Sequence, residues 1–162
     1  MQYYRFMEVI GIVALLAVLS TPALAETRKA KLDGFQEVPS ISTTGAGTFR
    51  ARINRDETAI DFELTYSGLE GTTVTQAHIH FSREGVNGAI VVFLCGGSKP
   101  ACPASGTVTG TLTEADIGAT AEDQGIAATE LGELIEAIRS KAAYVNVHTD
   151  LVPSGEIRGQ MK

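Results

Sequence analysis

Two short segments decide the fold: AHIHF at residues 77–81 and YVNVHT at residues 144–149. Side chains of an extended strand point alternately to its two faces. His78 and His80 therefore share one face of the first segment, and apolar side chains occupy the other. The second segment alternates in the same way and places His148 opposite an apolar face. Both segments are predicted to be half-buried strands that carry their imidazoles on the face away from the core.

The whole chain contains three histidines, and all of them lie in these two strands. If the strands pair, His78, His80 and His148 converge. Imidazole suits copper(II) and zinc, and three nitrogen ligands with one open position are typical of a reactive metal site. The three histidines are therefore candidate ligands for a copper or zinc cofactor. The alternative is that they are ordinary polar residues that hydrogen-bond across the strands and fix the register.

A metal site of this kind needs groups that hold the outer ring nitrogens of its ligands. Asn146, Glu156 or nearby backbone carbonyls are expected to supply them. Glu156 and Arg158 are also expected to share a strand face and to form an ion pair, worth under about 1 kcal/mol if it is exposed. Nothing in the sequence places Glu37 near the histidines.

The first 25 residues have the organisation of a secretory signal peptide. Arg5 lies in a short positive region, residues 9–19 form an apolar run, and ALA at residues 23–25 is a small-x-small cleavage site. The run is about half of the roughly 20 residues that cross a bilayer, so no membrane span is expected after cleavage. The sequence predicts an exported, secreted or periplasmic protein with one domain over residues 26–162.

The charge of the chain excludes some partners. Thirteen basic and nineteen acidic residues give a net charge of −6, and the basic residues do not cluster along the sequence. Such a chain is a poor candidate for binding nucleic acid or an anionic membrane surface. The expected partner is therefore a protein or a small ligand, whose identity the sequence does not give.

Cys95 and Cys102 are the two cysteines of the chain, and six residues separate them. An even number of cysteines in an exported protein favours a disulfide. Closing so short a loop stabilises the fold by about 2–3 kcal/mol in the chain-entropy model. The competing interpretation is a pair of thiolate metal ligands.

Short alternating segments punctuated by glycine run through the rest of the chain. They predict an all-β fold: an antiparallel, Greek-key-like β-sandwich or flattened barrel of about eight strands. The segment 89–94 is apolar on both faces and is predicted to be a central strand. Residues 130–142 change to the helical period and predict one short amphipathic helix. The expected strands are residues 29–32, 48–54, 58–66, 73–82, 89–94, 106–113, 143–149 and 156–160.

Several of these segments together resemble the CHRD domain, which was named from repeats in chordin. The resemblance covers roughly residues 29–161 and implies an exported β-sandwich that acts as a binding or structural module. Its motifs are LDGFQEVP (32–39), AHIH (77–80) with GVNG (85–88), YVNVHT (144–149) and PSGEIRGQ (153–160).

A weaker resemblance connects the histidine pattern to the copper/zinc superoxide dismutases. In that comparison His78 and His80 match the paired copper ligands of one strand, and His148 matches a late one. A binuclear site of that kind is excluded, because the chain has no fourth histidine. No arrangement for serine or cysteine nucleophilic catalysis is discernible, so the sequence favours a binding module over an enzyme. The alternative function is a mononuclear copper or zinc protein.

Overall fold

The computed structural model describes residues 25–162, so the predicted signal peptide, apart from Ala25, lies outside the described residues. One α-helix, α1 (Leu131–Arg139), and three short 3-10 helices, η1 (Gly34–Gln36), η2 (Glu114–Asp116) and η3 (Ala119–Gln124), are present. The strands are β1 (Glu26–Asp33), β2 (Ala46–Ile53), β3 (Ile60–Ser67), β4 (Val74–Phe81), β5 (Ala89–Cys95), β6 (Gly106–Leu112), β7 (Ala143–Thr149) and β8 (Ile157–Gln160).

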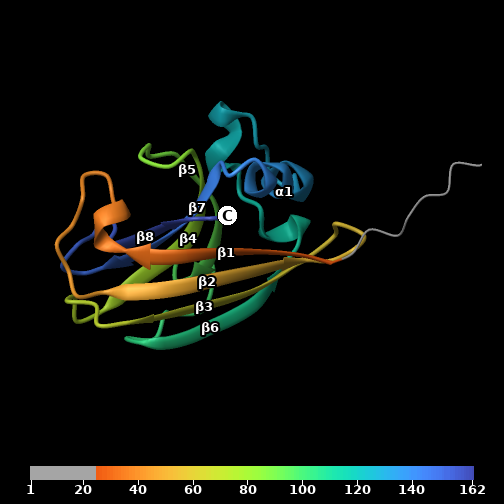
Figure 1. Cartoon of the computed structure of the whole chain (residues 1–162). Coiled ribbons are helices and arrows are strands. Elements are labelled where there is room, and N and C mark those ends of the chain that lie inside the picture. The colour runs from red at the N-terminus through yellow and green to blue at the C-terminus, as the bar shows by residue number, and fades with distance from the viewer. Residues whose placement is uncertain (1–24) are drawn as a thin grey trace, which may run out of the picture.

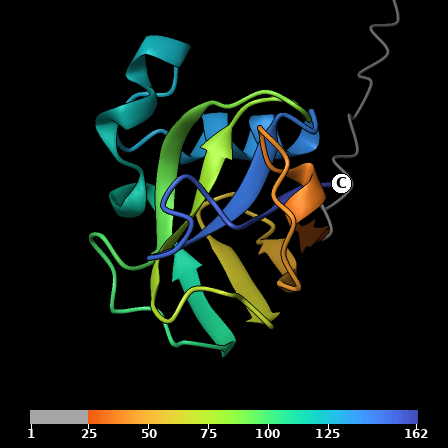
Figure 2. The same ribbon diagram turned by 90° about the vertical axis from the view of Figure 1, so that its left-hand side faces the viewer.

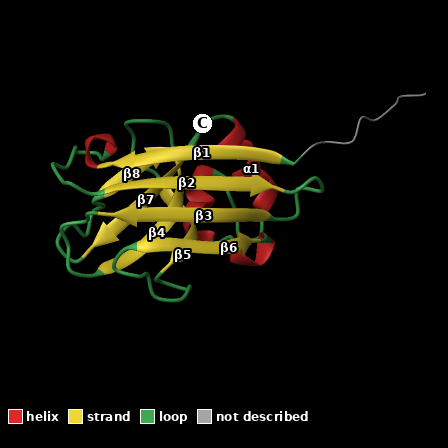
Figure 3. Ribbon diagram, turned by 60° about the horizontal axis from the view of Figure 1, so that its bottom comes forward, coloured by secondary structure: helices red, strands yellow, loops and turns green. Residues whose placement is uncertain are grey.

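All eight strands form one antiparallel sheet, in the order β5-β4-β7-β8-β1-β2-β3-β6. The sheet curls into a nearly closed, flattened barrel with α1 beside it (Figure 1). Figure 3 shows β1, β2, β3 and β6 side by side, with α1 behind them. The predicted all-β class, with about eight strands and one short helix, is confirmed. No helix among residues 25–162 is long and apolar enough to cross a membrane.

The hairpin of β2 and β3 follows from the alternation of its sequence. Phe49 pairs with Leu64 and Ala51 with Phe62, and all four side chains are buried in the core. The charged residues between them stay at the surface. At the turn, the side-chain oxygen of Asn54 accepts hydrogen bonds from two backbone N–H groups. The predicted hairpin with one exposed face is therefore confirmed.

Strand β5 lies at an edge of the sheet, so the predicted central position of residues 89–94 is wrong. Its second face is apolar because η3 packs beside it instead of another strand. The segment around η3 also satisfies the free backbone edge. Gly118 N–H donates to the carbonyl of Val91 at 3.1 Å, and Gln124 Oε1 accepts from the N–H of Ala89 at 2.6 Å. Covering the edge in this way prevents pairing with another chain.

Strands β4 and β7 are neighbours, and their register sets the histidine face. His78 lies opposite Asn146, and His80 lies opposite Tyr144. The other face of both strands packs into the core, as predicted. Figure 2 shows the segment after β1 and the loop between β7 and β8 on the near side of the barrel. Hydrogen bonds tie three segments over the histidine face: residues 34–39, 82–88 and 150–156.

Cys95 and Cys102 form the predicted disulfide. We expect the double variant Cys95→Ala, Cys102→Ser to lose about 2–3 kcal/mol of unfolding free energy, because the unfolded chain gains the entropy of the opened loop. Urea denaturation of the variant and of the reduced wild type measures this loss, and the two values should agree. A loss below about 1 kcal/mol in both would show that the loop is held by its own hydrogen bonds.

Candidate metal centre

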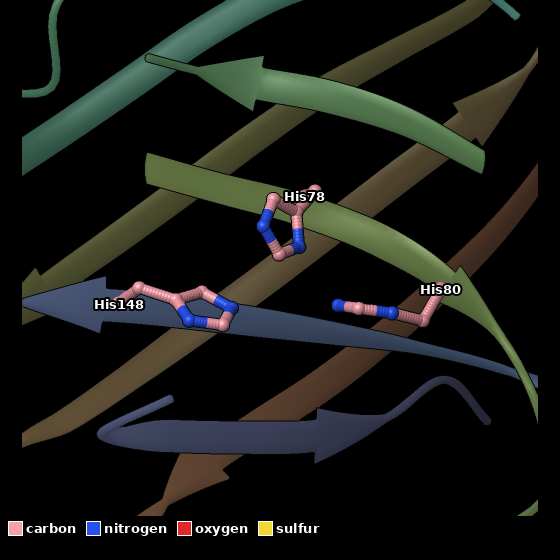
Figure 4. Close-up of side chains that lie close together, drawn as sticks. All are labelled: His78, His80 and His148. Carbon is pink, nitrogen blue, oxygen red and sulfur yellow. The ribbon is translucent and has the colours of Figure 1, made fainter. Parts of the chain in front are cut away.

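The structure pairs the two histidine strands and brings the three histidines together. His78 and His80 come from β4, and His148 comes from the neighbouring β7. The ring of His78 lies between the other two, with centroids 4.6 Å from His80 and 4.5 Å from His148. Each ring offers one nitrogen, and the three nitrogens lie within 4.8 Å of one another (Figure 4). Two segments about 70 residues apart in sequence thus build one cluster.

The face that carries the histidines is more buried than the prediction of half-buried strands implies. The side chains of His78, His80 and His148 are 0%, 9% and 7% exposed. The reason is the three covering segments, which have no hydrophobic periodicity and whose docking the strand pattern does not predict. The cluster is therefore a buried polar site on the outer side of the sheet, separate from the apolar core.

Backbone carbonyls orient two of the three rings. Nδ1 of His80 lies 2.8 Å from the carbonyl oxygen of Gly88, and Nδ1 of His148 lies 2.9 Å from that of Pro153. A carbonyl oxygen only accepts, so Nδ1 carries the proton in both rings and Nε2 is left with a free lone pair. Histidine ligands of metal ions are commonly held in this way, with the second ring nitrogen donating to a carbonyl. The expected carbonyl support is present.

Four buried ring nitrogens have no hydrogen-bond partner among the described residues. They are Nε2 of His80, Nε2 of His148 and both nitrogens of His78. Buried polar atoms are nearly always paired, and an unpaired one costs about 1–3 kcal/mol. The cross-strand hydrogen bonds that the alternative interpretation requires are absent from His78 within residues 25–162.

Burial keeps the cluster uncharged. Desolvation, together with the neighbouring imidazoles, lowers the pKa of His78 to about 2. Desolvation also lowers the pKa of His80 to about 4, against the opposing effect of its hydrogen bond to Gly88. The pKa of His148 is lowered by the same cause. All three rings are therefore neutral near pH 7, which is the form that binds metal ions.

Aromatic and cationic groups surround the rings. The ring of Tyr144 stacks on His80 at 4.6 Å, and the guanidinium of Arg158 lies 3.5 Å above the centre of the Tyr144 ring. Because β7 lies between β4 and β8, Tyr144 separates His80 from Arg158. Phe93 meets His78 edge-on at 5.2 Å. Arg158 is 1% exposed and donates to Asn87 and to two carbonyls of the turn at residues 82–88.

The expected ion pair between Glu156 and Arg158 is not formed. Glu156 instead accepts hydrogen bonds from the hydroxyls of Thr43 and Thr149 and from the N–H of Glu70, at 2.6–2.7 Å. It therefore ties the loop between β3 and β4 to the end of β7. The expectation that Glu156 supports an imidazole is also wrong, since none of its hydrogen bonds within the described residues reaches a histidine.

Glu37 is the residue of this region that the sequence does not place. Its carboxylate accepts a hydrogen bond of 2.5 Å from the side-chain amide of Asn146. Asn146, expected to hold a histidine, thus holds Glu37 instead. Burial raises the pKa of Glu37 to about 7, although the nearby charge of Arg158 and the hydrogen bond from Asn146 act in the opposite direction. A carboxyl group that titrates near neutral pH lies beside the histidine face.

The comparison with protein families agrees with the motifs. The family model of the CHRD domain matches residues 28–161. No curated protein and no solved structure matches the chain. The matched residues extend from β1 to the end of β8 and include all three histidines, Glu37 and the disulfide. The chain therefore belongs to the CHRD domain family.

Proposed function

We propose that this protein is an exported binding module whose ligand is one copper or zinc ion, held by His78, His80 and His148. Membership in the CHRD family supports a binding or structural role. The observation that carries the metal ligand is the set of four buried ring nitrogens without a hydrogen-bond partner in the described residues. A metal ion between the rings would use three of them at once.

The state of the rings supports this proposal. They are neutral, and carbonyls orient His80 and His148 so that Nε2 is the free nitrogen. Around an ion with metal–nitrogen bonds of about 2.0–2.1 Å, three imidazole nitrogens lie about 3.4 Å apart. The present separations, at most 4.8 Å, allow the ion after small ring rotations.

Export is supported by two independent features. The N-terminal sequence has the organisation of a signal peptide. The Cys95–Cys102 disulfide fits an oxidising compartment, such as the periplasm or the exterior of the cell. The module would therefore bind its metal ion outside the cytoplasm.

Titration of the purified protein with copper(II), copper(I) and zinc, in the presence of competing chelators, tests the proposal. We expect one ion per chain. His148→Ala should weaken the binding by about 100-fold or more, because it leaves only two of the three imidazole ligands. Thr109→Ala, on an exposed part of β6, is the control and should bind like the wild type. Weak binding of every ion that is the same in His148→Ala would overturn the proposal.

A further inference from the structure

We infer that the histidine cluster selects copper(I) over the divalent ions zinc and copper(II). This inference rests on the proposed function, because it assumes that the three imidazoles hold a metal ion. Three features carry it: the number of ligands, the burial of the cluster and the charge around it.

The cluster supplies three protein ligands and no fourth. Within residues 25–162, the group that can hold a metal consists of His78, His80 and His148 alone. Both cysteines are in the disulfide. The two buried carboxylates of the described residues are Glu37 and Glu156, and their hydrogen bonds go to other groups.

Ligand number separates the candidate ions. Zinc in proteins almost always takes four ligands, and copper(II) prefers a tetragonal site of nitrogen and oxygen ligands. Copper(I) and zinc both have a filled d shell, but copper(I) forms stable trigonal sites with three ligands, whereas zinc in proteins takes a fourth. The unpartnered nitrogens are fully buried, so bulk water does not reach them as a ready source of a fourth ligand.

Charge acts in the same direction. The Born energy of a buried ion grows with the square of its charge, so a divalent ion costs about four times as much to bury as a monovalent one. The three ligands are neutral, and no carboxylate of the described residues joins them. The guanidinium of Arg158 is itself buried on the far side of Tyr144. The ionised fraction of Glu37 offsets part of this positive charge, so the neutral charge of the three ligands is the main reason why a divalent ion is less favourable.

A matched pair of variants isolates the role of ligand number. Phe93 lies opposite His78 on β5 and meets its ring edge-on. Phe93→His places a fourth imidazole next to the cluster, whereas Phe93→Leu keeps the position apolar. The first variant should gain affinity for zinc, and the second should keep the preference of the wild type.

The experiment measures the affinity of the purified protein for copper(I), under anaerobic conditions with a chromophoric copper(I) chelator, and separately for zinc and copper(II). We expect copper(I) to bind at least about 100-fold more tightly than zinc, equivalent to about 2.7 kcal/mol. Phe93→His should narrow this ratio by about tenfold or more, while Phe93→Leu leaves it unchanged.

The outcomes separate this inference from the proposed function. If zinc or copper(II) binds one-to-one through His148 as tightly as copper(I), the selectivity is wrong but the metal site stands. If none of the three ions binds in a way that depends on His148, both fail together. A copper(I) preference that is equal in Phe93→His and Phe93→Leu would overturn the explanation by ligand number.

Discussion

Replacing His78 by leucine is expected to weaken one-to-one metal binding strongly without destabilising the metal-free protein. Both ring nitrogens of His78 are buried without a partner among the described residues, and the side chain is 0% exposed. Replacing an unpaired buried polar group by an apolar group of similar size is neutral or stabilising, by up to about 1–3 kcal/mol. The same change removes the central ligand of the cluster, so the metal affinity should fall by about 100-fold or more.

The neighbouring residue gives a matched control with the opposite result. Ile79 is the next residue of β4 and packs into the core on the other face. Ile79→Ala should lose about 2–5 kcal/mol of unfolding free energy but keep one-to-one metal binding. Urea denaturation in the presence of a chelator and metal titration measure the two properties separately. If His78→Leu instead lost more than about 2 kcal/mol, the histidine would be a structural residue, as in the hydrogen-bonding alternative.

Glu37→Gln is expected to change how the stability of the metal-free protein depends on pH. Burial raises the pKa of Glu37 from 4.5 to about 7, so the folded protein binds its proton more tightly than the unfolded chain. The stability of the wild type therefore falls, relative to Glu37→Gln, as the pH rises through this interval. Between pH 4.5 and a pH above 7, the unfolding free energy of the wild type should fall by about 3 kcal/mol relative to that of Glu37→Gln. The amide of glutamine keeps an acceptor for Asn146.

The three histidines change the stability with pH in the opposite direction, and their contribution must be separated from that of Glu37. Their folded pKa values lie below the ordinary 6.5, so their contribution to stability is present above pH 6.5 and is lost as the pH falls. This contribution is common to the wild type and Glu37→Gln, and it cancels in the difference between their stability curves. Exposed Glu63→Gln on β3 is the control. If the curves of the wild type and Glu37→Gln ran parallel from pH 4.5 to 8, Glu37 would titrate normally in the folded protein.

Strand periodicity predicts those parts of the fold in which one face of a strand packs into the core. The β2–β3 hairpin and the shared face of His78 and His80 are of this kind, since alternation alone decides which side chains meet. The position of β5 in the sheet could not be predicted in this way. Its sequence is apolar on both faces, and this pattern does not show whether its neighbour is another strand or η3. Periodicity therefore identifies which face of a strand is buried, but not which element packs against it.

The burial of the cluster depends on loops and could not be predicted in this way. Residues 34–39, 82–88 and 150–156 are held over the histidine face by individual hydrogen bonds, such as that from Asn146 to Glu37. The bond from Asn146 to Glu37 joins residues 109 positions apart, and the bonds of His80 and His148 go to backbone carbonyls, so none of them leaves a periodic pattern in the sequence. The family motifs LDGFQEVP (32–39), GVNG (85–88) and PSGEIRGQ (153–160) overlap these three segments, but they do not show that the segments dock over the histidines.

The most direct test of the metal site is X-ray diffraction from crystals of the copper-loaded protein, collected on both sides of the copper absorption edge. We expect one anomalous peak among the three rings, about 2.0–2.1 Å from Nε2 of His80, Nε2 of His148 and one nitrogen of His78. The result that would contradict the account is the lack of a peak at this position in crystals soaked with excess copper, with a water molecule bridging the ring nitrogens instead.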